Sequence, residues 1–347
     1  MKKKNYFSLL FVFALLLVGC KDNDDVKESD VVAMPNSSSF QNLRKAALAE
    51  LTQTKEFEVD GNGNIEFTSK KGVKVSIPEY CLTVNGGTVS GTVKLEFIEH
   101  FDKSTLLTTN IATMGRDSNG DVKFLVTGGA FYLKLTHNGK EVESPTYCNY
   151  ELEVPAKLTG KLDNTMKLWY GNFNEEGNLI WEEVITENWN PETGEGWNPE
   201  TGEGWNPEVP MPGLMFQDEK YLVIANKFGW VNIDRFYDNE LREVTPVTVK
   251  VPSEYDGKNS AVYMSYKEVP GLATIYYHID KKIFTTGNYT LPIGLEVHVI
   301  FASESNGKWA YAIKSAKITK DHQVEFLKSD LKEATQAEFE AAIEAIK

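Results

Sequence analysis

Few residues in this chain combine a reactive side chain with a spacing that could do chemistry. The histidines are scattered, and no local motif nominates a general acid and base. They are His100, His137, His278, His298 and His322. The sequence also lacks the Gly-x-Ser-x-Gly elbow of serine hydrolases, the phosphate-binding P-loop and the dinucleotide-binding glycine fingerprint. We therefore expect no catalytic site and no cofactor, with a hydrolase as the open alternative.

Cys20 is the residue with the clearest chemical role. Three lysines, an apolar run over residues 7–18 and a small residue precede it. The run is too short for a permanent transmembrane helix, so residues 1–19 are typical of a signal peptide. Leu17-Val18-Gly19-Cys20 resembles the bacterial lipobox, which implies cleavage before Cys20 and acylation of its thiol. A plain secretory signal or an uncleaved anchor is the alternative.

The other two cysteines, Cys81 and Cys148, form an even pair in a chain that this signal would send into an oxidising compartment. We expect them to form a disulfide between strands, and free buried thiols are the alternative. Residues 172–183 place oxygen ligands at calcium-loop spacing, but their flanks are typical of strands, whereas an EF-hand needs helices. No Cys/His cluster indicates zinc. The sequence therefore predicts no metal site.

An octapeptide, WNPETGEG, occurs twice in succession and begins a third time within residues 188–208, which spaces Trp189, Trp197 and Trp205 evenly. Eight residues rich in Pro, Gly, Thr and Glu cannot build a core, so residues 187–213 are predicted to be an exposed loop. The identical copies favour recent expansion of the gene. The alternative is that the three tryptophans contact a ligand by stacking on sugar rings.

The formal charge excludes some partners. Removal of residues 1–19 takes away three lysines and no acidic residue, which changes the charge from −14 to −17. Phosphate backbones should repel such a chain, so we expect no nucleic-acid partner. Residues 20–37 are predicted to be an acidic tether. The residues directly after Cys20, KDNDDVKESD (21–30), also look like the export signal of surface lipoproteins in Bacteroidota.

Beyond the tether, the sequence predicts a mainly β protein of two β-sandwich domains in tandem, with a short N-terminal helix and a C-terminal helix. A helix is expected from Ser38, which with Gln41 forms a capping-box pattern, and the apolar residues that follow recur at helical spacing. These are Leu43, Ala47, Leu48 and Leu51. Alternating runs with Gly, Asn and Asp at the turns follow, including expected hairpins over residues 57–69 and 166–184. Residues 329–346 should be the last helix, with a capping box of Thr335 and Glu338. We place the first domain at residues 38–186 and the second at residues 214–347.

Part of the first domain resembles a known family. VKVSIPEYCLTVNGGTVSGTVKLEFIEHFDKSTLL, followed by TGGAFYLKL, is similar to the ZU5-type β domain. FGWVNIDRF, residues 228–236, resembles a segment of Bacteroidota surface lipoproteins that carry such domains. The resemblance implies a β-sandwich scaffold used for interactions. Some ZU5 proteins cleave themselves at His-Phe-Ser, but this chain has His100-Phe101-Asp102, so self-cleavage is not expected.

Within the same segment, Asp234 and Arg235 could mark a ligand site, although hydrogen bonds to a neighbouring strand explain such a pair more simply. Taken together, the residues indicate a lipid-anchored protein of the bacterial outer membrane, with an outward-facing and an inward-facing orientation as the two alternatives. We expect it to bind or support other cell-surface proteins or glycans without catalysis. A glycan-handling enzyme or carbohydrate-binding accessory lipoprotein is the rival interpretation.

Overall fold

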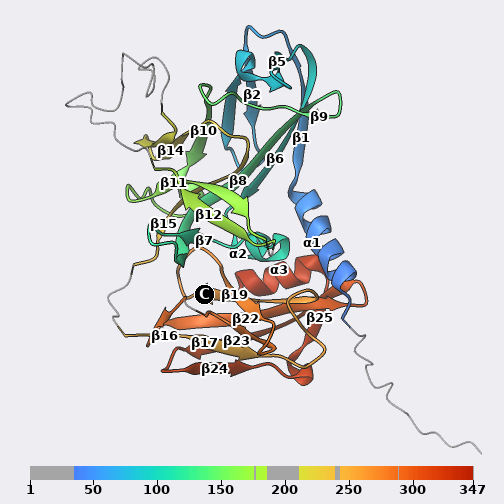
Figure 1. Ribbon diagram of the computed structural model, residues 1–347, viewed down its shortest axis with the longest axis vertical. Helices are drawn as coiled ribbons and strands as arrows, with labels where there is room; N and C mark the ends of the chain where they lie inside the picture. Colours follow the sequence, from blue (N-terminus) through green and yellow to red (C-terminus); the bar gives the residue numbers. More distant parts are fainter. Residues whose placement is uncertain (1–34, 176, 186–210, 239–242, 288, 347) are drawn as a thin grey trace, which may run out of the picture. The chain divides into compact units, whose positions relative to one another are not determined.

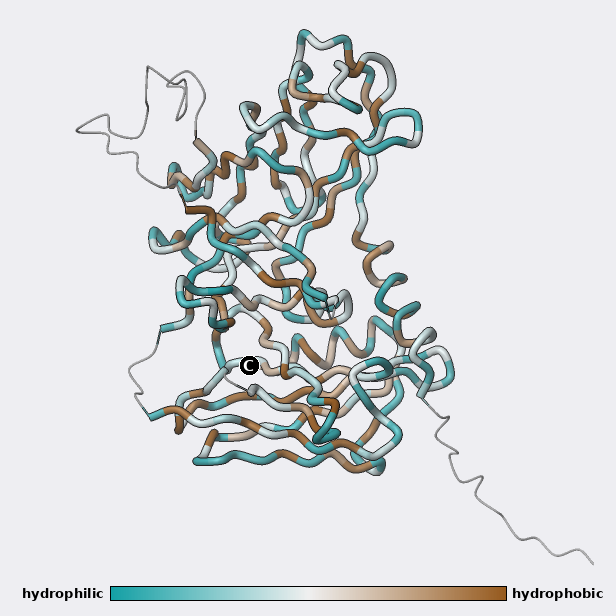
Figure 2. The backbone as a smooth tube through the Cα atoms, viewed as in Figure 1, coloured by the Kyte–Doolittle hydropathy of each residue, from teal (hydrophilic) through white to brown (hydrophobic). Residues whose placement is uncertain are grey.

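The computed structural model describes residues 35–175, 177–185, 211–238, 243–287 and 289–346. These residues form one compact unit that is mainly β, as the sequence predicts, with two β-sandwiches and three α-helices (Figure 1). Apolar stretches follow the strands of both sandwiches, and many connections are polar (Figure 2). Among the described residues, no helix has the length and apolar character needed to cross a membrane.

The first sandwich contains a large sheet and a small one. The strands of the large sheet are β1 (Gln53–Val59), β6 (Gly91–His100), β7 (Met114–Arg116), β8 (Val122–His137), β9 (Lys140–Glu141), β11 (Lys167–Phe173), β12 (Leu179–Glu183) and β15 (Gly229–Phe236). They are ordered β1-β6-β8-β15-β11-β12-β7, and β9 pairs antiparallel with the end of β8. Because β7 pairs with both β12 and the start of β8, five of these strands close into a ring.

The small sheet covers one face of the large sheet. Its strands are β2 (Asn64–Thr68), β3 (Lys74–Pro78), β10 (Tyr150–Pro155), β13 (Gly213–Gln217) and β14 (Lys220–Ala225), in the order β13-β14-β10-β3-β2. Along each strand, every second side chain points into the core between the sheets, because successive side chains of a strand point to opposite faces. In β8, for example, Phe131, Leu133 and Leu135 face this core. A small hairpin of β4 (Thr83–Val84) and β5 (Gly87–Thr88) lies outside both sheets.

The predicted boundary between the two domains is wrong. The sequence places residues 214–236 in the second domain, but β13 and β14 add to the small sheet and β15 lies between β8 and β11. The alternation of apolar residues shows that a segment is a strand, but it does not show which strand it pairs with. The first sandwich therefore closes only when the chain returns to it after the octapeptide segment.

The predicted hairpin over residues 57–69 is also wrong. β1 pairs with β6 in the large sheet, whereas β2 pairs with β3 in the small sheet. The turn between them carries the chain from one sheet to the other. Glu79 stabilises this turn, since its Oε2 accepts hydrogen bonds from the amides of Asp60 and Gly61, each at 2.9 Å. The second predicted hairpin is confirmed, because β11 and β12 pair antiparallel.

The second sandwich follows β16 (Val244–Thr245). Its main sheet has the strands β17 (Val247–Lys250), β18 (Ser260–Tyr266), β19 (Ala273–His278), β20 (Ile283–Thr285), β22 (Glu296–Ser305), β23 (Lys308–Lys317), β24 (His322–Glu325) and β25 (Lys332–Ala334), in the order β24-β17-β20-β19-β18-β22-β23-β25. β19 pairs with β18 through its first half and with β20 through its second half, so one continuous sheet encloses a core of its own. β16 (Val244–Thr245) and β21 (Leu291–Pro292) pair beside it.

The helices are α1 (Ser37–Leu51), α2 (Lys103–Thr109) and α3 (Gln336–Glu344), with 3₁₀ turns η1 (Glu79–Cys81), η2 (Ala156–Leu158) and η3 (Lys328–Asp330). Asn36, not Ser38, caps α1, since its side chain accepts from the Ser39 amide at 3.0 Å. The capping box of Thr335 and Glu338 is confirmed. The last helix is shorter than predicted, because residues 332–334 add a strand to β23 instead.

The two sandwiches share a third core, which the three helices complete. Trp169, Trp181 and Trp230 from the large sheet meet Tyr263 and Trp309 from the second sandwich there. Each of these rings is at most 8% exposed. Helix α1 contributes Phe40, and α3 contributes Phe339 and Ile343. The sandwiches are therefore joined by buried aromatic surface.

Candidate ligand-binding site

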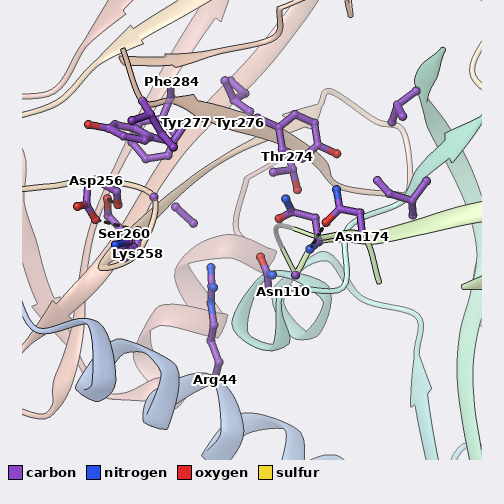
Figure 3. A pocket seen from close by; sticks show the side chains of 18 of the residues that line it. Arg44, Asn110, Asn174, Asp256, Lys258, Ser260, Thr274, Tyr276, Tyr277 and Phe284 are labelled. Atoms are coloured by element: carbon purple, nitrogen blue, oxygen red, sulfur yellow. Dashed lines mark hydrogen bonds between the residues drawn. The ribbon is translucent and has the colours of Figure 1, made fainter. Parts of the chain in front are cut away.

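A pocket of about 900 Å³ lies where the two sandwiches meet α1. Its lining comes from α1, the end of α2, β7, the β11–β12 turn, the 256–260 loop and the strands β18 to β20 (Figure 3). The volume is within the range of small-molecule sites, which are few in a protein. The pocket is thus the leading candidate for a binding site among the described residues.

Arg44 enters the pocket from α1 and is held at its base. The guanidinium donates to the hydroxyl of Tyr263 at 2.8 Å and lies 4.2 Å from the ring centroid of Phe40. The Tyr263 hydroxyl in turn donates to Oδ1 of Asn110 at 2.5 Å. Tyr263 is fully buried, and Asn110 ends α2 in the left-handed conformation with φ 62°. The Arg44 side chain is therefore positioned before any ligand binds.

Three further cations line the pocket. Arg116 on β7 pairs with Glu182, its Nε lying 2.9 Å from Oε1. Lys258 and Lys282 are exposed. Within the part of the chain that the structure describes, neither lysine nor Arg44 has a carboxylate within ion-pair distance. The pocket therefore concentrates positive charge in an acidic chain.

An aromatic wall faces these cations. Tyr277 is half-buried, and its ring packs edge-on against buried Phe284, with centroids 5.1 Å apart. A Cβ atom on Gly257 would lie 2.9 Å from Cβ of Tyr277, so glycine lets this loop approach the tyrosine. The loop is stabilised by Asp256, whose Oδ1 accepts from the amides of Lys258 at 2.8 Å and Asn259 at 3.2 Å. Tyr277 therefore lies against a loop of defined conformation.

Amide side chains supply neutral donors and acceptors. Asn174 and Asn178 reach the pocket from the β11–β12 turn, where Oδ1 of Asn174 accepts from the Asn178 amide at 2.8 Å. Asn110 joins them from α2 (Figure 3). Amide groups can donate and accept at once. The lining can thus bind hydroxyl groups as well as an anion.

Two fully buried ionisable residues of the first sandwich, His100 and Asp234, do not line this pocket. His100 is fully buried, and burial, with the nearby charge of Lys71, lowers its pKa to about 3. Its imidazole stacks on Trp230 at 5.8 Å, and Nδ1 lies 3.2 Å from the Thr105 hydroxyl. Burial also raises the pKa of Asp234 well above its usual range. With no exposed surface, His100 and Asp234 are packing residues of the large sheet.

The Asp234-Arg235 pair has the structural role that its sequence favoured. Asp234 Oδ2 accepts from Nδ2 of Asn232 at 2.5 Å. Arg235 Nε donates to Oδ2 of Asp163 at 2.7 Å and ties β15 to the segment before β11. Neither residue lines the pocket.

The other predicted site residues divide into two groups. Cys81 and Cys148 are joined in a disulfide, with their Cα atoms 5.6 Å apart, and it links η1 to the segment that leads into β10. Cys20, Trp189, Trp197 and Trp205 lie outside the described residues. Within the described ranges, no group of three or more His, Cys, Asp or Glu side chains could hold a metal ion.

No protein-family model matches the chain, and no curated protein matches it.

The pocket residues were missed in the sequence because they come from segments that are far apart. Arg44 and Tyr277 are separated by most of the chain, and each looks like an ordinary residue of an amphipathic element. One local signal was available. The DGKN stretch at residues 256–259 is typical of a structured turn, and it carries a lysine.

Proposed function

We propose that this chain is a lipid-anchored protein of the bacterial outer membrane that binds a surface component in its pocket without catalysis. The lipobox-like Leu17-Val18-Gly19-Cys20 and the acidic tether support the anchor. The resemblance of residues 73–107 to ZU5-type domains supports a role in interactions. The single observation that carries the binding role is the pocket with Arg44 preset at its base.

The chemistry of the pocket supports binding over hydrolysis. Glycoside hydrolysis ordinarily uses two carboxyl groups that flank the scissile bond. Among the described residues that line the pocket, Asp256 is the one carboxylate, and its Oδ1 is occupied by backbone amides. The arrangement fits recognition of a ligand that stays intact.

Fatty-acid labelling tests the anchor. Cells that express the full chain should incorporate labelled palmitate into it, and Cys20→Ser should abolish the label. Thr54→Ser is the control, because it makes a small change at an exposed position and keeps all three cysteines. Label that persists in Cys20→Ser would contradict lipid attachment at this residue. Protease treatment of intact cells then decides the orientation, since only an outward-facing chain is digested.

Ligand capture tests the binding role. The full chain, purified in detergent, should retain saccharides or proteins from an extract of the cell surface. Chromatography of the saccharides after prolonged incubation separates the two interpretations. Unchanged saccharides support a binding protein, whereas shortened products support the glycan-handling enzyme. Failure to retain any surface component would contradict the binding role.

A further inference from the structure

We infer that the pocket is a site for an acidic saccharide, with Arg44 as the contact for its carboxylate or sulfate group. This inference rests on the proposed binding function and narrows it to one class of ligand. It follows from three properties of the lining. The positive charges have no carboxylate partners, the guanidinium of Arg44 is held in place, and the ring of Tyr277 lies beside amide side chains.

The charge of the lining favours an anionic partner. Arg44, Lys258 and Lys282 come from α1, the 256–260 loop and the β19–β20 turn, and none pairs with a carboxylate in the described ranges. Asp256 is the one opposing charge in the described lining, and backbone amides hold it. Like charges that converge on one pocket repel each other, so an anion bound there relieves this repulsion.

Arg44 is suited to a planar, two-oxygen anion. Its contacts with Tyr263 and Phe40 fix the guanidinium, whose Nε is buried and has no hydrogen-bond partner among the described residues. A guanidinium donates two parallel hydrogen bonds to a carboxylate or to two sulfate oxygens, and a fixed one loses little freedom on binding. The side chain thus recognises the shape of the acidic group as well as its charge.

The rest of the lining fits a sugar ring better than a single inorganic ion. At about 900 Å³ the pocket is far larger than one sulfate or phosphate. The half-buried ring of Tyr277 offers a face for the C–H groups of a pyranose, while its edge is supported by Phe284. Asn110, Asn174 and Asn178 can pair with hydroxyl groups that project from such a ring.

Calorimetric titration of the full chain in detergent tests this assignment with four probes. They are a galacturonic acid trisaccharide, a sulfated galactose trisaccharide, a neutral galactose trisaccharide and ATP. We expect at least one acidic trisaccharide to bind at least about tenfold more tightly than the neutral one and ATP, and more weakly as salt increases. The comparison of the two acidic probes identifies the acidic group.

Two variants locate the site. Arg44→Gln should weaken binding of the acidic probe by about tenfold or more, and Arg44→Lys should restore part of it. Because Arg44 also packs on Phe40, a second variant removes the exposed charges Lys258 and Lys282 by substitution with Gln. Its matched control substitutes Lys45 and Lys281 with Gln, which removes the same charge from neighbouring exposed positions outside the lining.

Each outcome decides the assignment. Selective acidic binding that falls in the pocket variants, but not in the control, supports it. Equal or tighter binding of the neutral probe or of ATP overturns the ligand class and leaves the proposed binding function standing. Acidic binding that falls equally in the control reflects general charge and overturns the site. If no saccharide binds and cell-surface capture also fails, the proposed function falls as well.

Discussion

Thr113 and Leu272, which belong to different sandwiches, are joined by a reciprocal pair of hydrogen bonds. The Thr113 amide donates to the Leu272 carbonyl at 2.8 Å, and the Leu272 amide donates to the Thr113 hydroxyl oxygen at 3.0 Å. The same hydroxyl donates to the carbonyl of Leu125 on β8 at 2.9 Å. One buried threonine thus links the β18–β19 turn to the large sheet of the first sandwich.

Thr113→Val should destabilise the protein by about 1–3 kcal/mol, because valine has the same size but leaves the buried Leu272 amide without its acceptor. Urea unfolding measures this loss. Thr54→Val on β1 is the control, since Thr54 is exposed, and it should change the free energy of unfolding by less than about 0.5 kcal/mol. Equal effects at the two positions would show that the link between the sandwiches contributes little.

His100 should make the protein less stable in mild acid. Its pKa falls from 6.5 to about 3 on folding, so the folded state excludes a proton that the unfolded state binds. The stability from this group is complete above pH 6.5 and decreases as the pH falls towards 3. Between pH 7 and pH 5 the loss should be about 2 kcal/mol. Denaturant unfolding at several pH values measures it.

His100→Gln should flatten this dependence, whereas His137→Gln, at the far end of β8, should keep it. Asp234 acts in the opposite direction, because its raised pKa makes the folded state more stable as the pH falls. Since Asp234 is present in every variant, the difference between wild type and His100→Gln isolates the histidine. An unchanged slope in His100→Gln would mean that other groups control the acid response.

Loss of the disulfide should cost about 2–5 kcal/mol, the usual effect of removing a native bridge. Cys81 and Cys148 are separated by 67 positions, and both are at most 2% exposed. Thermal unfolding of a double variant with serine at both positions measures the cost. The bridge itself is tested by thiol titration of unreduced, denatured protein. The detection of two free thiols from these residues would rule it out.

Deletion of residues 189–204, two full octapeptide units, should leave thermal stability nearly unchanged. Surface connections tolerate changes in length, because loop-closure entropy varies slowly with the number of residues. The connection joins β12 to β13, and both strands remain intact in the deletion. A fall in melting temperature of more than about 4 °C would indicate packing of the repeat on the sandwich. Lost glycan binding at unchanged stability would identify the tryptophans as a binding device.

Local features of the fold could be predicted from sequence. The Thr335 capping box, the β11–β12 hairpin and the mainly β class each depend on residues within a few positions of one another. Pairing between distant strands could not be predicted, since β15 would have paired equally well, by its pattern, within the second sandwich. The N-cap of α1 was predicted at Ser38 but is Asn36, because Asn and Ser are both good N-cap residues and several stand side by side here.

The pocket could not be predicted either, because its residues come from distant segments that meet only in the folded chain. The pocket has an excess of positive charge because Arg44 comes from α1 and Lys258 from the second sandwich. In the described ranges, neither has a carboxylate within ion-pair distance. In the sequence, Lys258 follows Glu254 and Asp256, which would be expected to neutralise it, whereas the acidic residue nearest to Arg44 is Glu50, six positions away. Only the arrangement of the elements shows that Glu254 pairs with Lys328, while Oδ1 of Asp256 accepts hydrogen bonds from backbone amides.

The position of β15 between β8 and β11 has a consequence for biosynthesis. A ribosome releases β8 and β11 well before residues 229–236, so the central position of the large sheet stays vacant while at least 50 further residues are made. During this interval both neighbouring strands present unpaired edges, the feature that promotes association between nascent chains. The chain therefore depends on late insertion of one strand, and slow translation or early release before residue 236 would leave it prone to aggregate.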